Sequence, residues 1–216
     1  ALELSRRAQL SDTEVFRQGW FEVQDASSQR VAPMLAPEPG MRVVDACAGA
    51  GGKTLHLAAL MQGRGEILAL DVHEKRLEEL RRRALRAGVS TVNTALATEE
   101  EIARREASAD RLLLDVPCSG LGTLRRAPDA KWRLSPAFLD QVTALQAQLL
   151  ASYSRMLRPG GRMVYSTCSV LPRENGRQVA RFLEEHPGFR LLEEHSLLSS
   201  REGYDGFYMA LLQREG

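Results

Sequence analysis

The sequence contains few cysteines, no long apolar run and almost no excess of charge of either sign. Its three cysteines, at positions 47, 118 and 168, are odd in number and far apart, which excludes a disulfide framework and favours a reducing compartment. No apolar run approaches the roughly 18 residues that a membrane span needs. The four histidines lack the spacing of metal ligands. We therefore expect a cytoplasmic protein with no membrane or metal partner, and we expect it to act as a monomer.

The charge balance does not by itself indicate nucleic-acid binding. The 216 residues carry 29 lysines and arginines against 28 acidic residues, whereas proteins that bind nucleic acid usually show a basic surplus. Lysine occurs only at positions 53, 75 and 131, so almost all basic residues are arginine. Because guanidinium groups bind phosphate through two hydrogen bonds and stack on bases, a local arginine patch is still compatible with nucleic-acid binding.

Strands and helices alternate along the chain from residue 42 onward. The patterns predict strands at 42–46, 66–71, 111–115 and 162–166, helices at 54–61, 75–86, 136–157 and 173–185, and weaker strands at 189–193 and 207–212. This alternation is typical of an α/β fold with a largely parallel sheet. We expect residues 1–36 to form an N-terminal arm with a short helix at 31–36, packed on a single domain of residues 37–216.

Reactive residue types follow the four clear strands where each strand ends. Three strands end at Asp45, Asp71 and Asp115, and the fourth runs into Ser166, Thr167 and Cys168. In sheets of this kind, ligands bind beyond the carboxyl ends of the strands. The sequence therefore predicts that three acids and a cysteine meet at one edge of the sheet.

A glycine-rich turn at residues 45–54 joins the first strand to the first helix. It is not a P-loop, because Cys47 stands where that motif needs glycine, and it is not a dinucleotide fingerprint, because Thr54 takes the place of the third glycine. Asp71 follows Gly51 by twenty residues, the spacing at which an acid reaches ribose hydroxyls. A nucleoside cofactor without a required pyrophosphate, S-adenosylmethionine, fits this pattern; a purely structural turn is the alternative. The candidate cofactor-binding residues are Cys47, Ala48, Gly49, Ala50, Gly51, Gly52, Lys53, Asp71, Arg76 and Asp115.

Two cysteines, Cys118 and Cys168, follow the third and fourth strands. A single buried cysteine usually serves packing, and we interpret the side chain of Cys47 in that way. Two cysteines at the same edge of a sheet, close to Asp115, are instead candidates for a thiolate nucleophile.

The chain carries several motifs in a fixed order. They are Val-Gln-Asp-Ala-Ser-Ser-Gln at 23–29, the turn at 45–54, Asp-Val-Pro-Cys-Ser-Gly at 115–120, Pro-Asp-Ala-Lys-Trp at 128–132, Tyr-Ser-Thr-Cys-Ser at 165–169, Glu174-Asn175, and Asp-Gly-Phe-Tyr-Met-Ala at 205–210. In these motifs the sequence resembles the Sun/Fmu-type RNA cytosine-C5 methyltransferases of the NOL/NOP/Sun family, and most of all the bacterial members that act on ribosomal RNA.

The resemblance implies a fold, a reaction and roles for four residues. The fold would be that of a class I S-adenosylmethionine-dependent methyltransferase, Rossmann-like, with a mostly parallel sheet and an antiparallel C-terminal strand. The reaction would transfer a methyl group to C5 of a cytosine in RNA, either ribosomal RNA or a ribosomal subunit. Cys168 would add to C6 of the base, and Cys118 would assist removal of the C5 proton and release of the adduct. Asp115 would hold the cytosine edge near N3 and also lie against the cofactor, and Lys53 would point into the same site.

The sequence departs from the family pattern at two places. The family turn usually contains proline where this chain has Ala50, which removes stiffness but no contacting group. The family also usually carries an acid near the adenine after its next strand, whereas residues 91–98 contain none and the first acid is Glu99. We expect a hydroxyl or a backbone group there to contact the adenine instead.

A basic loop follows the Cys118 motif closely. Its candidate RNA-binding residues are Arg125, Arg126, Lys131, Trp132 and Arg133. Cationic and aromatic side chains together suit phosphate contact and base stacking. The alternative is a solvated loop with Trp132 packed inward. We interpret the arginines at 81–83 and 86 as a solvated helix face, and Arg6 and Arg7 as either RNA contacts or part of an exposed arm.

Two other functions remain open on the sequence. A DNA cytosine-C5 methyltransferase would use Cys118 as its nucleophile, but such an enzyme does not require Cys168. A non-catalytic RNA-binding factor for ribosome assembly would need neither thiol.

Overall fold

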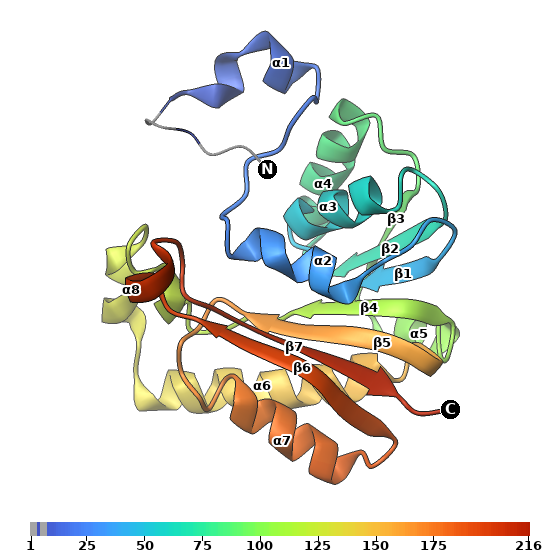
Figure 1. Cartoon of the computed structure of the whole chain (residues 1–216), viewed down its shortest axis with the longest axis vertical. Helices are drawn as coiled ribbons and strands as arrows, with labels where there is room; N and C mark the ends of the chain where they lie inside the picture. Colours follow the sequence, from blue (N-terminus) through green and yellow to red (C-terminus); the bar gives the residue numbers. More distant parts are fainter. Residues whose placement is uncertain (1–3, 5–7) are drawn as a thin grey trace.

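The computed structural model describes residue 4 and residues 8–216, except for the side chains of Arg133 and Glu202; Arg6 and Arg7 lie outside the described residues. Within this part of the chain, one sheet has the strand order β3-β2-β1-β4-β5-β7-β6 (Figure 1). Its strands are β1 (Arg42–Asp45), β2 (Glu66–Asp71), β3 (Val92–Leu96), β4 (Ala109–Asp115), β5 (Leu157–Thr167), β6 (Phe189–Leu197) and β7 (Phe207–Arg214). Strands β1 to β5 are parallel, and β7 is antiparallel to both of its neighbours. The prediction of a mostly parallel sheet with an antiparallel C-terminal strand is confirmed.

Helices cover both faces of the sheet. They are α1 (Glu14–Arg17), α2 (Val31–Leu35), α3 (Gly52–Leu60), α4 (Glu74–Arg86), α5 (Glu99–Arg104), α6 (Pro136–Ser154), α7 (Gly176–Glu185) and α8 (Ser199–Glu202). Helices α2, α3 and α4 lie on one face, and α6 and α7 lie on the other (Figure 1). Of the described helices, none is long and apolar enough to cross a membrane.

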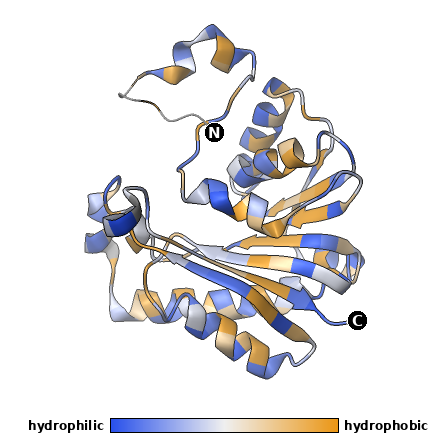
Figure 2. Cartoon of the chain, in the orientation of Figure 1, coloured by the Kyte–Doolittle hydropathy of each residue, from blue (hydrophilic) through white to orange (hydrophobic). Residues whose placement is uncertain are grey.

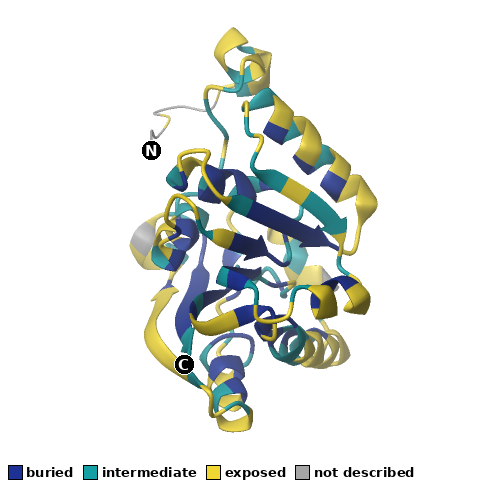
Figure 3. Cartoon of the chain, turned by 90° about the vertical axis from the view of Figure 1, so that its right-hand side faces the viewer, coloured by how far each residue is buried: buried dark blue, intermediate teal, exposed yellow. Residues whose placement is uncertain are grey.

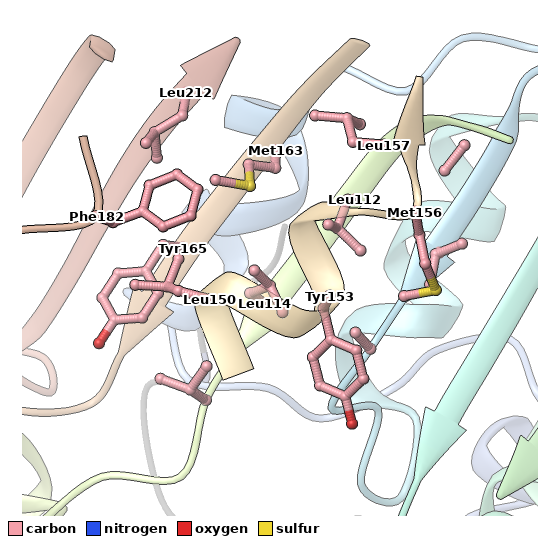
Figure 4. Close-up of a cluster of buried hydrophobic side chains, with 14 of the residues drawn as sticks. Leu112, Leu114, Leu150, Tyr153, Met156, Leu157, Met163, Tyr165, Phe182 and Leu212 are labelled. Carbon is pink, nitrogen blue, oxygen red and sulfur yellow. The ribbon is translucent and has the colours of Figure 1, made fainter. Parts of the chain in front are cut away.

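The central strands are apolar on both faces, so each face carries its own core. Leu112 and Leu114 of β4 belong to the cluster under α6, whereas Leu113 points to the opposite face and packs with α2 and α3. Figure 4 shows Leu150 and Tyr153 of α6 among the strand side chains of this cluster. The central strands are the apolar and buried part of the molecule, and the outer helix faces are polar and exposed (Figures 2 and 3). Burial of each such leucine contributes on the order of 2 kcal/mol.

The predicted elements differ from the observed ones at several places, including helix α8, which was not predicted, and β6, which runs to Leu197 rather than to 193. The sequence patterns did not predict strand β3 or helix α5. Strand β3 was missed because it is only partly buried and lacks a continuous apolar run. Helix α6 ends at Ser154 rather than at 157, and Pro159-Gly160-Gly161, which we expected to follow the helix, lies inside β5. Helix α7 begins at Gly176 rather than at 173, because Asn175 has a non-helical backbone (φ −113°, ψ −115°).

The N-terminal segment is bound to α4 through Glu22. The Glu22 carboxylate pairs with Arg83 and with Arg86, whose side chains are 17% and 23% exposed. The interpretation of these two arginines as solvated is therefore wrong, since a partner distant in the sequence covers them. Arg81 and Arg82, which pair with Glu74 and Glu79 on the same helix, are exposed as expected.

Candidate active site

The site lies where the strand order reverses, at the carboxyl ends of β1 and β4. The chain leaves β1 toward β2 and β3 on one side and returns to β4 on the other, which opens a crevice at this point. A cavity of about 140 Å³ occurs there, and its lining includes Gln24 and Ser28 of the N-terminal segment together with Asp45, Cys47, Ala48, Gly52, Lys53 and Asp115. A larger open hollow of about 820 Å³ lies between the N-terminal segment and α4, but it contains none of the predicted site residues.

The glycine-rich turn presents bare backbone at this crevice. Gly49 and Gly51 have φ values of +54° and +88°, in the left-handed region that favours glycine. A Cβ atom on Gly51 would approach Leu80 to 2.6 Å, whereas one on Gly49 or Gly52 would meet only open space. Helix α3 begins at Gly52, so its free N–H groups face this space. The turn can therefore accept a ligand against its backbone.

The side chains of Asp71 and Arg83 form hydrogen bonds to the backbone of the turn. The Asp71 carboxylate accepts hydrogen bonds from the Gly49 N–H at 3.0 Å and from the His73 N–H at 2.8 Å. Arg76 lies 3.6 Å from the same carboxylate. Arg83 donates to the Ala50 carbonyl oxygen at 2.8 Å, which restrains the turn at the position where the family has proline.

Lys53 and Asp115, which both line the cavity, form an ion pair. The Lys53 Nζ atom lies 2.6 Å from Asp115 Oδ2, and Ser166 donates to the other carboxylate oxygen at 2.9 Å. The lysine also lies over the Phe207 ring, 5.1 Å from its centroid. The Asp115 carboxylate thus compensates for the repulsion between the Lys53 ammonium group and the positive N-terminal end of α3.

The two predicted reactive thiols are in direct contact. The Sγ atoms of Cys118 and Cys168 are 3.3 Å apart, and both thiols are free. The hydrogen bond from Cys118 lowers the pKa of Cys168, and the positive charge of Lys53 acts in the same direction. The same hydrogen bond, together with burial, raises the pKa of Cys118. These shifts favour Cys168 as the thiolate of the pair and Cys118 as the donor.

Cys47 differs from these two cysteines. Burial and the nearby carboxylates of Asp45, Asp115 and Asp71 raise the pKa of Cys47, and its side chain packs against the core under α6. A protonated, partly buried thiol is a poor nucleophile.

Asp45 is a fully buried acid beneath the turn. Thr54 donates to its Oδ2 atom at 2.7 Å, whereas Oδ1 has no hydrogen-bond partner among the described residues. Burial raises the pKa of Asp45 to about 7. The native carboxyl group thus holds its proton more tightly than the unfolded chain does. The stability it contributes is present below about pH 4 and is lost as the pH rises through about 7.

The variant Asp45→Asn should remove this loss. We compare the stability of the variant with that of the parent protein at each pH. The difference should shift in favour of Asp45→Asn by about 4 kcal/mol between about pH 4 and about pH 8. Urea unfolding at the two pH values measures the difference, and the comparison cancels any packing defect that does not depend on pH. An equal effect at both pH values would show that Asp45 stays ionised in the native protein.

A buried polar network lies directly behind the thiols. The Glu174 carboxylate is fully buried and accepts hydrogen bonds from Ser119 and Ser169, the residues that follow the two cysteines. Thr167 donates to Asn175, and Asn175 donates to the Ser169 carbonyl oxygen. We did not predict roles for these residues, although Glu174-Asn175 lies within the motif set and an acid that follows an apolar strand so closely was a usable signal.

The basic loop is exposed beside the site. Trp132 is 78% exposed, which excludes the alternative that it packs inward, and Lys131 lies over its ring at 4.7 Å from the centroid. Arg125 is exposed, whereas Arg126 pairs with the buried Asp205. Arg133 belongs to the same 3-10 turn, Pro128–Arg133. The structure thus exposes the Trp132 ring and two cations, Arg125 and Lys131, on this loop, with Lys131 already over one face of the ring.

Residues 91–98 lack the acid that the family usually carries near the adenine, and in this segment Thr98 has a structural role. Its hydroxyl accepts from the Glu101 N–H at 3.2 Å and caps α5. The Ala97 N–H donates to the Asp71 carbonyl oxygen. The Ala97 N–H is thus used within the protein, whereas the Thr98 hydroxyl keeps its proton and a second lone pair, so its contact with the adenine stays a prediction.

The comparisons with known proteins agree with this geometry. Residues 32–213 match the family model described as 16S rRNA methyltransferase RsmB/F. A Synechocystis protein named "Probable ribosomal RNA small subunit methyltransferase B" is 44% identical over 81% of this chain and 40% of its own length. Ribosomal RNA small subunit methyltransferase B of Proteus mirabilis is 37% identical over 93% of this chain and 47% of its own length. The chain thus spans about half the length of these relatives or less.

Solved structures show the same fold. The NSun6 structure from Pyrococcus horikoshii with SFG superposes with a TM-score of 0.89 at 27% identity, over 97% of this chain and 57% of that chain. A methyltransferase homologue from the same organism superposes with a TM-score of 0.85 at 30% identity, over 97% and 73% of the two chains. The sheet order and these neighbours are those of the class I methyltransferase fold. On its sequence match and its fold, the chain belongs to the RsmB/F family of 16S rRNA methyltransferases.

Proposed function

We propose that this chain is the catalytic part of an S-adenosylmethionine-dependent RNA cytosine-C5 methyltransferase that acts on 16S ribosomal RNA. The observation that carries the proposal is the pair of thiols 3.3 Å apart, beside the Lys53–Asp115 ion pair at the carboxyl edge of the sheet. The names of its relatives support small-subunit ribosomal RNA as the substrate. We further propose that it works as a cytoplasmic monomer, with residues 37–216 as the catalytic domain and Gln24 and Ser28 of the arm lining its cavity.

The residues present fit the cofactor. The open space above Gly49 and Gly52 leaves room for a ligand against the backbone, and Asp71 stands at the end of the neighbouring strand. The unpartnered Oδ1 atom of Asp45 belongs to a residue that lines the same cavity, and it can accept a hydrogen bond from a cationic group. The turn 47–53 with Asp71, Arg76 and Asp115 would hold S-adenosylmethionine, which supplies the methyl group.

The side chains can perform the covalent part of the reaction. The Cys168 thiolate adds to C6 of the cytosine, and the electron pair displaced from the C5–C6 bond makes C5 nucleophilic. Asp115 holds the N3 edge of the base by accepting a hydrogen bond from the amino group beside N3, and Lys53 keeps Asp115 in place. Once Cys168 is bonded to carbon, Cys118 no longer donates to a thiolate, so it can lose its proton to solvent. After C5 has received the methyl group, Cys118 takes the proton from C5, the C5–C6 double bond re-forms and Cys168 leaves as a thiolate.

The basic loop would contact the RNA. Trp132 offers a face for base stacking, and Arg125 and Lys131 offer charges for phosphate, with Arg126 and Arg133 in the same loop. The target base must leave any stack to expose both of its faces to the thiol and to the methyl donor.

Transfer of labelled methyl groups tests the proposed function. The protein is incubated with labelled S-adenosylmethionine and either unmethylated 16S ribosomal RNA, assembled small subunits or duplex DNA, and the modified base is then mapped. Label at C5 of a cytosine in RNA supports the proposal. Label in DNA alone would indicate a DNA methyltransferase, and tight RNA binding without label on any substrate would indicate an assembly factor.

Asp71 should be important for cofactor binding. It holds the Gly49 N–H and stands where an acid reaches ribose hydroxyls, so Asp71→Ala should weaken S-adenosylmethionine binding by about 10- to 100-fold. Calorimetry measures this affinity. The control is Asp140→Ala, which removes an exposed acid paired with Arg173 and should bind as the parent does. An unchanged affinity in Asp71→Ala would remove Asp71 from the cofactor site.

A further inference from the structure

The carboxylate of Glu174 joins the two loops that carry the thiols. It accepts from the Ser119 N–H at 2.7 Å, from the Ser119 hydroxyl at 2.5 Å and from the Ser169 hydroxyl. The two hydroxyl oxygens are themselves 3.1 Å apart. Ser119 directly follows Cys118 and Ser169 directly follows Cys168, so one side chain binds both loops one residue away from each sulfur.

The rest of the chain holds Glu174 in turn. Gln146 of α6 donates to the carboxylate at 3.1 Å, and the Tyr165 hydroxyl donates to the Glu174 carbonyl oxygen at 2.6 Å. Glu174, Gln146 and Tyr165 are fully buried. A buried carboxylate is costly unless its lone pairs are filled, and here four donors fill them. Two of the three donor residues, Ser119 and Ser169, stand on the loops that carry the cysteines. If either loop moved, the buried carboxylate would lose hydrogen bonds that nothing else replaces.

From this geometry we infer that Glu174 is a positioning residue for the reaction, which sets the separation of the Cys118 and Cys168 sulfur atoms by binding both of their loops to one carboxylate. The inference rests on the proposed function in taking these two thiols as the reacting pair. Glu174 makes no hydrogen bond to either thiol in the structure; it binds their loops through Ser119 and Ser169, and its negative charge also raises the pKa of Cys118.

Glutamine at position 174 has nearly the same shape as glutamate but would weaken the hydrogen bonds that join the two loops to this side chain. A carboxylate presents two acceptor oxygens, whereas a carboxamide replaces one oxygen by an NH2 group that faces the same hydroxyls and N–H groups. Both serine hydroxyls bind Oε2 and the Ser119 N–H binds Oε1, so in Glu174→Gln the NH2 group faces either the hydroxyls or the Ser119 N–H. In both orientations Ser119 loses one of its two acceptor oxygens. The hydrogen bond between the sulfur atoms depends on their separation of 3.3 Å and should weaken with it.

The pH dependence of Cys168 alkylation reports on this separation without RNA or cofactor. The groups that bear on the Cys168 thiol are Cys118 after β4, Asp115 at the end of β4, Lys53 of α3 and Arg126 of the basic loop. Because the hydrogen bond from Cys118 favours the thiolate, its loss should move the alkylation midpoint upward. Iodoacetamide labelling of the full chain, followed by mass spectrometry of the Cys168 peptide, gives the midpoint for this cysteine alone.

We expect the midpoint to rise by about one pH unit in Glu174→Gln and by a similar amount in Cys118→Ala. The double variant should show no further rise, because both changes act through the same hydrogen bond. The matched control is Glu101→Gln, another buried glutamate, which pairs with Arg104 and Arg105 and lies away from the thiols; its midpoint should equal that of the parent. An unchanged midpoint in Glu174→Gln, or a rise that adds to that of Cys118→Ala, would overturn the inference.

Two milder variants keep the test decisive if Glu174→Gln does not fold. Ser119→Ala and Ser169→Ala each remove one donor to the carboxylate while leaving it bound on the other side, and each should shift the midpoint in the same direction by less. No shift in either would overturn the inference. In turnover assays, a folded Glu174→Gln protein should lose about 10- to 100-fold in kcat with KM for RNA little changed. A protein inactive on every nucleic acid would contradict the proposed function, but the alkylation result would still decide the role of Glu174.

Discussion

Cys168→Ala is expected to abolish both methyl transfer and covalent RNA binding, whereas Cys118→Ala should accumulate an RNA–protein complex that survives denaturation. The reason is that the contact with Cys118 and the charge of Lys53 favour the thiolate form of Cys168, while Cys118, 3.3 Å away, is placed to complete the reaction. Loss of the nucleophile should reduce the rate by about four orders of magnitude or more. A denaturing gel of labelled RNA, incubated with S-adenosylmethionine and each variant, measures the complex.

The double variant Cys118→Ala/Cys168→Ala is the control for this experiment. It should lose the complex that Cys118→Ala forms, which would show that the bond to RNA runs through Cys168. A complex that forms in Cys168→Ala and requires Cys118 would reverse the two roles and favour the chemistry of the DNA enzymes.

Lys53→Met should produce the second largest loss, and the loss should depend on pH. The Lys53 ammonium group lowers the pKa of Cys168 and also neutralises Asp115 at 2.6 Å. Without it, the carboxylate of Asp115 raises the pKa of the Cys168 thiol, and the thiolate population at neutral pH falls. We expect methyl transfer at about pH 7 to fall by about 100-fold and to recover in part by about pH 9, because the thiolate then forms without help from the lysine.

Lys75→Met is the matched control, because Lys75 is an exposed residue of α4. It should retain the parent rate and pH profile. A uniform loss in Lys53→Met, with no recovery at high pH, would show that Lys53 acts by orienting Asp115 or the substrate rather than through the thiolate.

Local patterns predicted much of the fold because the central strands are short and almost fully apolar. The boundaries of β2 match the prediction, and those of β1 and β4 differ by one or two residues, since these strands are buried on both faces. The pattern failed at the partly buried β3, whose alternation is weak, and at residues 157–161, where Pro159 and the two glycines lie within a strand instead of a turn. There, pairing with β4 and β7 outweighs local preference.

Part of the candidate site could likewise be predicted from the sequence, and part depends on the tertiary structure. The sequence alone determined that three acids and two cysteines follow buried strands, and in a parallel sheet such residues must meet at one edge. Only the tertiary structure decided which groups touch: Lys53 with Asp115, Cys118 with Cys168, and Glu22 with the arginines of α4. The tertiary structure also decided that Glu174 turns inward to bind both thiol loops while Arg126 pairs with Asp205. The physical reason is that strand periodicity specifies the face and the end on which a residue lies, whereas hydrogen bonds and charge pairs depend on loop positions that long-range packing sets.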